Sequence, residues 1–215
     1  MRKLVLKMSI SVDGFVAGPT GEIDWLLRTM DKSMVDWIEN TLWQAGVHIM
    51  GRKTYNDMVA YWPTSSDPLA APMNEIPKLV FSKKGIIEPA GAGATTQALK
   101  DTSRIDAEKG ITKSALSASY STWVNVPVAT DMVAEINKLK QQDGKFILAH
   151  GGASFAQDLV KHGLIDEYRL VIHPVILGKG LPLFELAPHP LDLALESSTA
   201  LESGVVANIY TMKKC

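Results

Sequence analysis

Apolar and polar residues fall into two kinds of segment along the chain. Short, nearly continuous apolar runs are typical of strands that are buried in a sheet. They occupy residues 3–11, 46–50, 77–84, 145–150 and 165–177. The segments between them have apolar residues at helical spacing or show helix-start signals. These are residues 31–43, a short helix from Arg52 to just before Trp62, 129–144 and 151–163.

The last part of the chain has a different pattern, because two strand-like segments follow each other directly. Residues 193–203 and 205–213 flank Gly204 and predict an antiparallel hairpin. Elsewhere strands alternate with helices, which favours parallel pairing. We therefore predict an α/β fold: a single three-layer domain over residues 1–215, with a mostly parallel twisted sheet, helices on both faces and an antiparallel C-terminal hairpin.

One segment breaks this alternation. Residues 88–122 are rich in Ala, Gly, Ser and Thr and contain few large apolar side chains. Such a composition provides little apolar surface to bury. We therefore interpret 88–122 as a low-complexity insertion, either a mobile lid or a poorly ordered loop.

Composition then excludes several classes of function. The 215 residues are 46% hydrophobic and carry a formal net charge of −1, so no basic field for nucleic acid is expected. The apolar runs are too short for a membrane span, and the N-terminus lacks a signal-peptide pattern. Cys215 is the only cysteine and the histidines lack metal-ligand spacing, so no metal site is expected. We expect a soluble cytoplasmic protein.

Polar and glycine residues follow three of the predicted strands. The strand at 46–50 leads into Gly51, Arg52, Lys53 and Thr54; the other two sets are Ser82–Lys83–Lys84 and His150–Gly151–Gly152–Ala153–Ser154. In an open α/β sheet, ligands bind beyond the carboxyl ends of the strands. Free N–H groups at a helix start bind phosphate, and glycine permits close approach. The three sets together predict a clamp for a ligand with separated phosphates; packing glycines and solvated lysines are the alternative.

Familiar catalytic motifs are absent. The sequence has no GxSxG, no HExxH and no P-loop spacing. An enzyme of this kind can still transfer hydride, because a cofactor then carries the chemistry and the protein supplies geometry.

The motifs, taken in order, resemble those of a known family. They are SVDGFVAG, IDWL, HIMGRKTY, KLVFSKK and HGGASFAQDLVKHGLIDEYRLVIHPVILGKGLPLF. This series resembles the dihydrofolate-reductase-like superfamily, most closely the branch with the reductase (C-terminal) domain of the bifunctional riboflavin-biosynthesis deaminase-reductase. The match covers residues 3–87 and 123–213, without any deaminase-like part. The resemblance implies a dihydrofolate reductase-like fold, NADPH as the cofactor and a homodimer.

The resemblance also assigns roles to single residues. Phosphates would be contacted by Arg52, Lys53 and Thr54, and the adenosine 2′-phosphate by Ser82 and Lys83. The pyrophosphate would lie on Gly151, Gly152, Ala153, Ser154 and Phe155. Val16 and Ala17 would flank the nicotinamide, with Ser9 and Asp13 near the reacting end.

The sequence also departs from dihydrofolate reductases. Those enzymes anchor the pteridine with an acid on the first helix, and here both Asp31 and Asp36 fall near that place. Spacing does not choose between them, and each also suits a helix cap or a solvated helix face. Trp25 and Trp37 could wall a planar substrate or pack in the core.

Two functions from different classes follow. The first is an NADPH-dependent reductase that transfers hydride to a small heterocyclic substrate, pterin-like or pyrimidine-like. The second is a non-catalytic, NADP(H)- or nucleotide-binding regulatory protein on the same scaffold, since a fold does not establish a function. For the homodimer, the apolar, Gly- and Pro-bent segment IHPVILGKGLPLF is the candidate interface.

Overall fold

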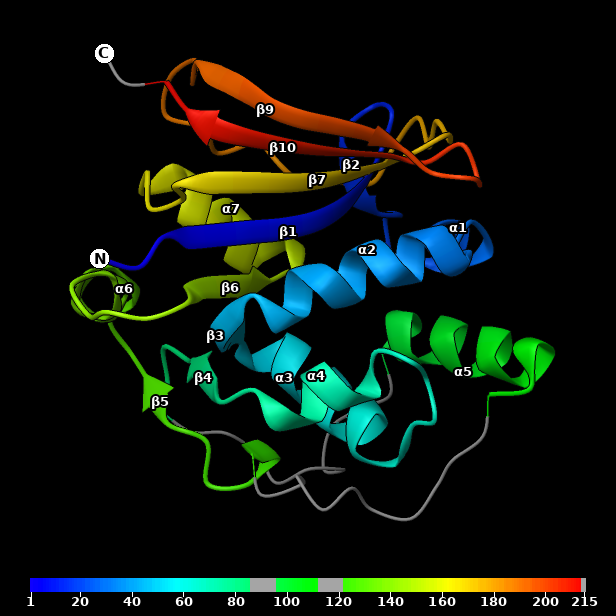
Figure 1. Ribbon diagram of the computed structural model, residues 1–215, viewed down its shortest axis with the longest axis horizontal. Coiled ribbons are helices and arrows are strands. Elements are labelled where there is room, and N and C mark those ends of the chain that lie inside the picture. The colour runs from blue at the N-terminus through cyan, green and yellow to red at the C-terminus, as the bar shows by residue number, and fades with distance from the viewer. Residues whose placement is uncertain (86–95, 112–121, 214–215) are drawn as a thin grey trace.

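The computed structural model describes residues 1–85, 96–111 and 122–213. Its centre is an eight-stranded sheet with the order β5-β4-β3-β6-β1-β7-β10-β9 (Figure 1). The strands are β1 Leu4–Ser11, β3 Ala45–Gly51, β4 Lys78–Phe81, β5 Val128–Ala129, β6 Phe146–His150, β7 Glu167–His173, β9 Leu193–Ala200 and β10 Val206–Met212. All pairs from β5 to β7 are parallel, and β10 is antiparallel to both β7 and β9. The predicted fold class and C-terminal hairpin are confirmed.

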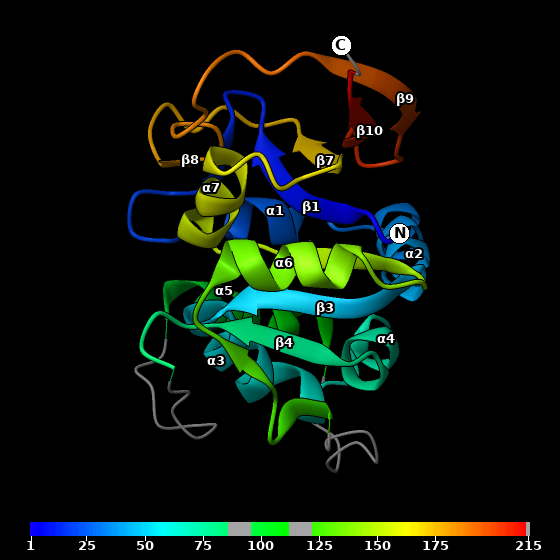
Figure 2. The ribbon, with the colours of Figure 1, turned by 90° about the vertical axis from the view of Figure 1, so that its left-hand side faces the viewer.

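Helices cover both faces of the sheet, as the pattern predicted (Figure 1, Figure 2). One face carries α2 Lys32–Trp43, α3 Arg52–Tyr61 and α4 Ala70–Glu75; the other carries α6 Met132–Lys140 and α7 Ala153–Lys161. The remaining described elements are α1 Asp24–Arg28, α5 Gln97–Lys109, a 3₁₀ turn at Trp62–Thr64, and a small sheet of β2 Phe15–Ala17 with β8 Leu181–Pro182. Among the described residues, no helix has the length and apolar character needed to cross a membrane.

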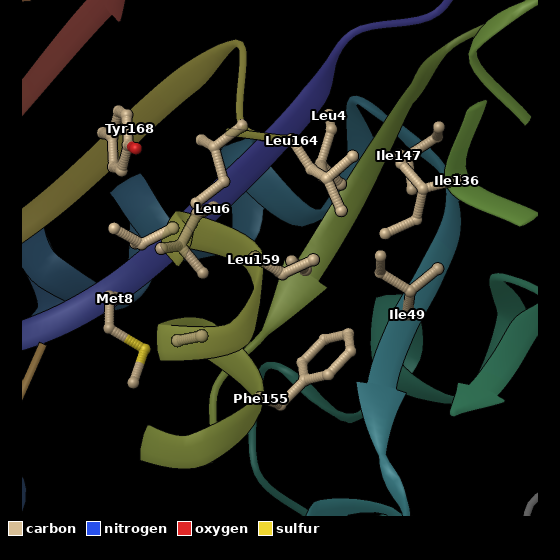
Figure 3. Packing of buried hydrophobic residues seen from close by; sticks show 14 of the residues in the cluster. Leu4, Leu6, Met8, Ile49, Ile136, Ile147, Phe155, Leu159, Leu164 and Tyr168 are labelled. Carbon is tan, nitrogen blue, oxygen red and sulfur yellow. The ribbon is translucent and has the colours of Figure 1, made fainter. Parts of the chain in front are cut away.

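Two hydrophobic clusters hold these layers together. In the cluster of Figure 3, Leu6 and Ile147 of the central strands pack against Phe155 and Leu159 of α7. Fully burying one such side chain contributes about 1.5–3 kcal/mol. The other cluster joins the sheet to α2 through Met34, Ile38 and Leu42.

The start of α2 illustrates how the sequence sets an element boundary. The Asp31 carboxylate accepts a hydrogen bond from the Met34 backbone N–H at 2.8 Å and caps the helix. Such a cap is worth about 1 kcal/mol. Gly204 has φ +81° at the hairpin turn, a conformation that glycine adopts without strain. Both boundaries agree with the sequence prediction.

The prediction for 88–122 is wrong over its central part, where α5 forms a helix with Asp101 and Ile105 buried. Thr96 caps its start by accepting from the Leu99 N–H, and Gly110, with φ +71°, ends it. The flanking parts of the prediction fall on 88–95 and 112–121, outside the described residues. The helix predicted at 129–144 ends earlier, at Lys140.

Candidate functional site

A large cavity lies at the edge of the sheet where the parallel strands end. Its volume is about 1460 Å³. Its wall includes all three polar segments that follow strands in the sequence: 51–54, 82–84 and 150–155. The topology brings them together because β3, β4 and β6 are parallel neighbours, so their carboxyl ends share one edge.

The N-termini of α3 and α7 lie side by side in this wall. A Cβ added at Gly152 would lie 2.7 Å from Oγ1 of Thr54, in the first turn of α3. A Cβ added at Gly51 would lie 3.3 Å from the Cβ of Phe155, in the first turn of α7. Glycine at both positions is therefore what allows the two helix starts to approach so closely.

The same two glycines are the N-caps of their helices. Neither Gly51 nor Gly152 has a side chain that could hydrogen bond to the first-turn N–H groups, and neither helix start has a side-chain cap. Two adjacent sets of N–H donors with positive dipole ends suit two linked phosphates. Arg52 and Lys53 add cationic side chains to the same wall. This part of the cavity fits the pyrophosphate of a dinucleotide.

Ser82 and Lys83 follow β4 and also line the cavity. Ser82 is buried, and its backbone N–H donates to the Ala129 carbonyl. The Lys83 side chain is exposed, and its Nζ lies 3.9 Å from the Asp158 carboxylate on α7. Their placement beside the helix starts is compatible with a 2′-phosphate, and their role remains a prediction.

The predicted nicotinamide-flanking residues reach the cavity as well. Val16 and Ala17 on β2 and Ser9 on β1 are in its wall. The structure also places Lys7 there, which the sequence prediction missed, next to His150 of the third polar set. They are register partners on β1 and β6. A charged residue inside the mostly apolar run LVLKMSIS was the signal that could have identified Lys7.

The environment of Lys7 and His150 alters their protonation. Burial lowers the pKa of Lys7 to about 8. Burial, aided by the charges of Lys7 and Lys78, lowers the pKa of His150 to about 3. His150 is therefore neutral at pH 7, and its Nε2 has no hydrogen-bond partner in the described part of the chain. Lys7 is a cation close to its titration point and lines the same cavity as Val16 and Ala17.

The three predicted catalytic acids do not line the cavity. Asp31 caps α2, and the exposed Asp36 pairs with Lys32 at 2.6 Å, one helical turn away. Asp13 accepts hydrogen bonds from the Ser11 hydroxyl and from the Gly178 N–H, which lower its pKa. These contacts suit structural roles, and the catalytic assignment of the three acids finds no support in their positions.

Trp25 is not in the cavity wall either. It is buried, its Nε1 donates to the Glu22 carbonyl at 3.2 Å, and its ring meets His173 edge-on at 5.2 Å. The aromatic pair belongs to the core. This position agrees with the packing interpretation of Trp25 rather than the substrate-binding one.

Other acidic groups do line the cavity, on the side formed by α3 and α5. Burial raises the pKa values of Asp57 and Asp106. The Tyr61 hydroxyl hydrogen bonds to the Asp106 carboxylate, and burial raises the pKa of this tyrosine as well. Nearby apolar side chains are contributed by α1, α2 and α3, among them Leu27, Ile38 and Met58. This side offers hydrogen-bond acceptors within an apolar pocket.

No cluster of His, Cys, Asp or Glu that could hold a metal occurs in the ranges 1–85, 96–111 and 122–213.

Comparison with known proteins agrees with this geometry. The sequence model of the RibD C-terminal domain family matches residues 2–207 of this chain. The chain belongs to this family. Uncharacterized protein YyaP of Bacillus subtilis is 32% identical over 209 residues, which cover 97% of this chain and 94% of YyaP. The predicted membership of the RibD C-terminal branch is confirmed.

Solved structures of RibD family members and reductases share the fold. A putative riboflavin biosynthesis protein from Shewanella sp. PV-4 superposes with a TM-score of 0.66 at 20% identity, covering 99% of both chains. Dihydrofolate reductase from Enterococcus faecalis, in a complex with NADP(H), gives a TM-score of 0.56 at 9% identity and covers 99% of this chain and 97% of the reductase. At these identities the likeness concerns the fold.

Proposed function

We propose that this RibD C-terminal domain protein is an NADPH-dependent reductase that transfers hydride to a small heterocyclic substrate, pterin-like or pyrimidine-like. The observation that carries the proposal is the pair of adjacent helix N-termini at α3 and α7. The first-turn N–H groups of both helices lack a side-chain cap, and both helix starts line one cavity. The fold shared with an NADP(H)-bound reductase supports the choice of cofactor. NADPH, when bound, supplies the hydride.

In this mechanism the residues of the chain bind the cofactor, orient the reacting rings and supply a proton to the substrate. Gly51 to Thr54 and Gly151 to Phe155 hold the pyrophosphate, while Ser82 and Lys83 favour NADPH over NADH by contacting the 2′-phosphate. Val16, Ala17 and Ser9 border the space left for the reacting rings. Excluding water there keeps the hydride donor and acceptor in contact.

Lys7 is the proton donor in this proposal. When hydride reaches a ring carbon, the adjoining nitrogen or oxygen gains an electron pair and needs a proton. With a pKa of about 8, the Lys7 ammonium is largely protonated at pH 7 and releases a proton readily. Neutral His150 beside it adds no competing charge.

The acceptors on the other side of the cavity support a heterocyclic substrate. Asp57, Asp106 and the Tyr61 hydroxyl lie in the wall formed by α3 and α5. Ring N–H and amino groups of a pterin or a pyrimidine are hydrogen-bond donors that complement these oxygens. The apolar side chains between them suit the faces of a flat ring.

The test is a fluorescence titration of the purified protein with NADPH and with NADH, followed by a turnover screen. The screen uses dihydrofolate, dihydropterins and pyrimidinone ribosyl compounds. We expect tighter binding of NADPH, and oxidation of NADPH with at least one substrate. Equal affinities would remove the 2′-phosphate role of Ser82 and Lys83.

A non-catalytic NADP(H)-binding protein is the second candidate. The observation that favours it is that Asp13, Asp31 and Asp36 all lie outside the cavity wall. This candidate predicts NADPH binding without turnover on any compound of the screen. Measured turnover excludes it.

A further inference from the structure

The α5 helix lies beside α1 at the edge of the cavity, although α1 occupies Asp24–Arg28 and α5 occupies Gln97–Lys109, far apart in the sequence. The two helices come from distant parts of the chain, and both contribute to the cavity wall. Leu26, Leu27 and Met30 do so from α1 and its end, and Leu99 and Thr102 do so from α5. Contacts that fix α5 against α1 therefore also fix the shape of the cavity.

Asp101 makes the first such contact. Its side chain is on α5 and is only 7% exposed. One carboxylate oxygen accepts from the backbone N–H of Ile23 at 2.9 Å, and the other accepts from Nε2 of Gln97 at 2.8 Å. Ile23 is the N-cap of α1, so its N–H would otherwise have no partner within that helix. A buried carboxylate thus serves the backbone of a segment 78 positions away.

Lys109 makes the second contact, at the other end of α1. Its Nζ donates to the carbonyls of Leu27 and Met30, at 3.1 Å each. These carbonyls lie where α1 ends, and a cation is favourable at that end of a helix. The opposite charges of Asp101 and Lys109 therefore meet the two opposite ends of α1.

The segment that leads into α1 is the loop that follows β2. Thr20, Gly21 and Ile23 of this loop line the cavity next to Ala17. Glu22 ties the loop to itself, because its carboxylate accepts from the Thr20 N–H and its carbonyl accepts from the Gly18 N–H, both at 2.9 Å. The Ile23–Asp101 bond is what joins the end of this loop to α5.

We propose that Asp101 is a positioning residue that holds the 18–23 loop and α1 against α5, and so keeps the cavity in the shape that binds the nicotinamide end of NADPH. The effect on NADPH rests on the proposed function. Lys109 assists, but its contact is exposed to solvent and contributes less than the buried one.

The experiment compares three variants with the wild-type protein. Asp101→Ala removes both acceptors. Asp101→Asn keeps one oxygen for the Ile23 N–H, and the Gln97 amide can turn to accept from the new NH₂ group. Glu108→Gln is the matched control, because Glu108 is exposed on the same helix and forms an ion pair with Arg104 rather than a contact with α1.

Two quantities are measured for each variant: amide hydrogen exchange of Ile23 by NMR, and the dissociation constant of NADPH by fluorescence. We expect Asp101→Ala to speed Ile23 exchange about tenfold or more through local opening. We also expect it to weaken NADPH binding about fivefold or more, by lowering the populated fraction of the competent cavity. Asp101→Asn should restore most of both values, and Glu108→Gln should change neither.

The outcomes separate the two proposals. Unchanged Ile23 exchange in Asp101→Ala overturns the positioning role, and so does faster exchange with unaltered NADPH affinity. If wild-type protein binds no NADPH, the proposed function fails and the exchange result alone decides the positioning role. Should Asp101→Ala not fold, Asp101→Ser, whose hydroxyl is too short to reach Ile23, takes its place.

Discussion

At the scale of single residues, Lys78 is a lysine in an almost fully buried position, 4% exposed at the start of β4. Its Nζ donates to the Thr122 hydroxyl at 2.6 Å and lies 4.3 Å from the centre of the Trp123 ring. Burial lowers its pKa to about 7. The hydroxyl and the indole ring thus stabilise a lysine that loses its charge close to neutral pH.

We predict that Lys78→Met changes how stability depends on pH. In wild-type protein the folded-state pKa of about 7 is below the ordinary value of 10.5. Between these two values the unfolded chain binds the extra proton, so the stability contributed at this position rises with pH, by at most about 1.4 kcal/mol per pH unit. The advantage of Lys78→Met should therefore be largest below pH 7 and shrink towards pH 10. Urea unfolding of both proteins at pH 6, 8 and 10 measures it; a constant difference would contradict the prediction.

Lys7 gives a second prediction at this scale. If its ammonium donates the proton, turnover should fall as pH rises above about 8, because the protonated form is then lost. Lys7→Met should lower turnover about 100-fold or more, a typical contribution of general acid catalysis. Lys7→Arg keeps a charge that does not titrate and should be nearly as inactive, while its NADPH affinity stays close to that of wild type. A fully active arginine variant would assign Lys7 an electrostatic role only.

The polar residues that follow the strands, compared with Asp36, show which parts of the site the sequence could reveal. The residues after β3, β4 and β6 were predicted correctly to share one wall, because parallel strands impose that proximity. Asp36 was one of two candidate anchoring acids, with Asp31, by analogy of position on a helix, and its side chain instead pairs with Lys32 one turn away. Which face of a helix lies towards the cavity depends on how the helix packs against the sheet. The residue type at one position does not determine that packing.

At the scale of elements, the contact between the starts of α3 and α7 gives a test of the phosphate clamp. Gly152 has φ −125° and ψ 137°, which alanine adopts without strain, so the cost of Gly152→Ala comes from Thr54 Oγ1 alone. We expect Gly152→Ala to weaken NADPH binding about tenfold, since the two helix starts must separate.

A double-mutant cycle checks that reason. Thr54→Ala removes the Oγ1 that meets the new Cβ, and Gly152→Ala in this background should cost clearly less than in wild type. The dissociation constants of NADPH for the four proteins give the coupling. Additive effects would mean that Gly152 and Thr54 act independently and that close approach of the helices is not what matters.

The α5 helix shows why part of the fold escaped prediction. Only Asp101 and Ile105 are buried on it, so the apolar stripe is too sparse to detect in an Ala- and Ser-rich segment. Its two end signals, Thr96 and Gly110, were present in the sequence. Helices α2 and α7 were found because each buries four side chains at regular spacing. Apolar periodicity outweighs end signals when a helix is predicted from sequence. The α5 helix has the end signals but lacks the apolar periodicity.

At the scale of the whole molecule, we propose that two copies associate through the segment after β7. It leaves several large apolar side chains exposed: Ile176, Leu181, Phe184 and Leu186. Exposed apolar groups gathered in one segment are typical of an interface. Light scattering should give the mass of a dimer, and Ile176→Asp should give a monomer. Leu195→Asp, on the exposed edge strand β9, is the matched control and should remain dimeric; a monomeric wild-type mass would contradict the proposal.

The position of β1 in the sheet has a consequence for how the protein is made. This first strand lies between β6 and β7, whose residues 146–150 and 167–173 are translated long after it. On the ribosome, β1 therefore has neither of its neighbours until most of the chain has been synthesised, and its apolar face must stay unpaired or be shielded by chaperones during that time. Slowing translation after β4 should therefore prolong the exposure of LVLKMSIS and lower the yield of soluble protein, without altering the finished fold.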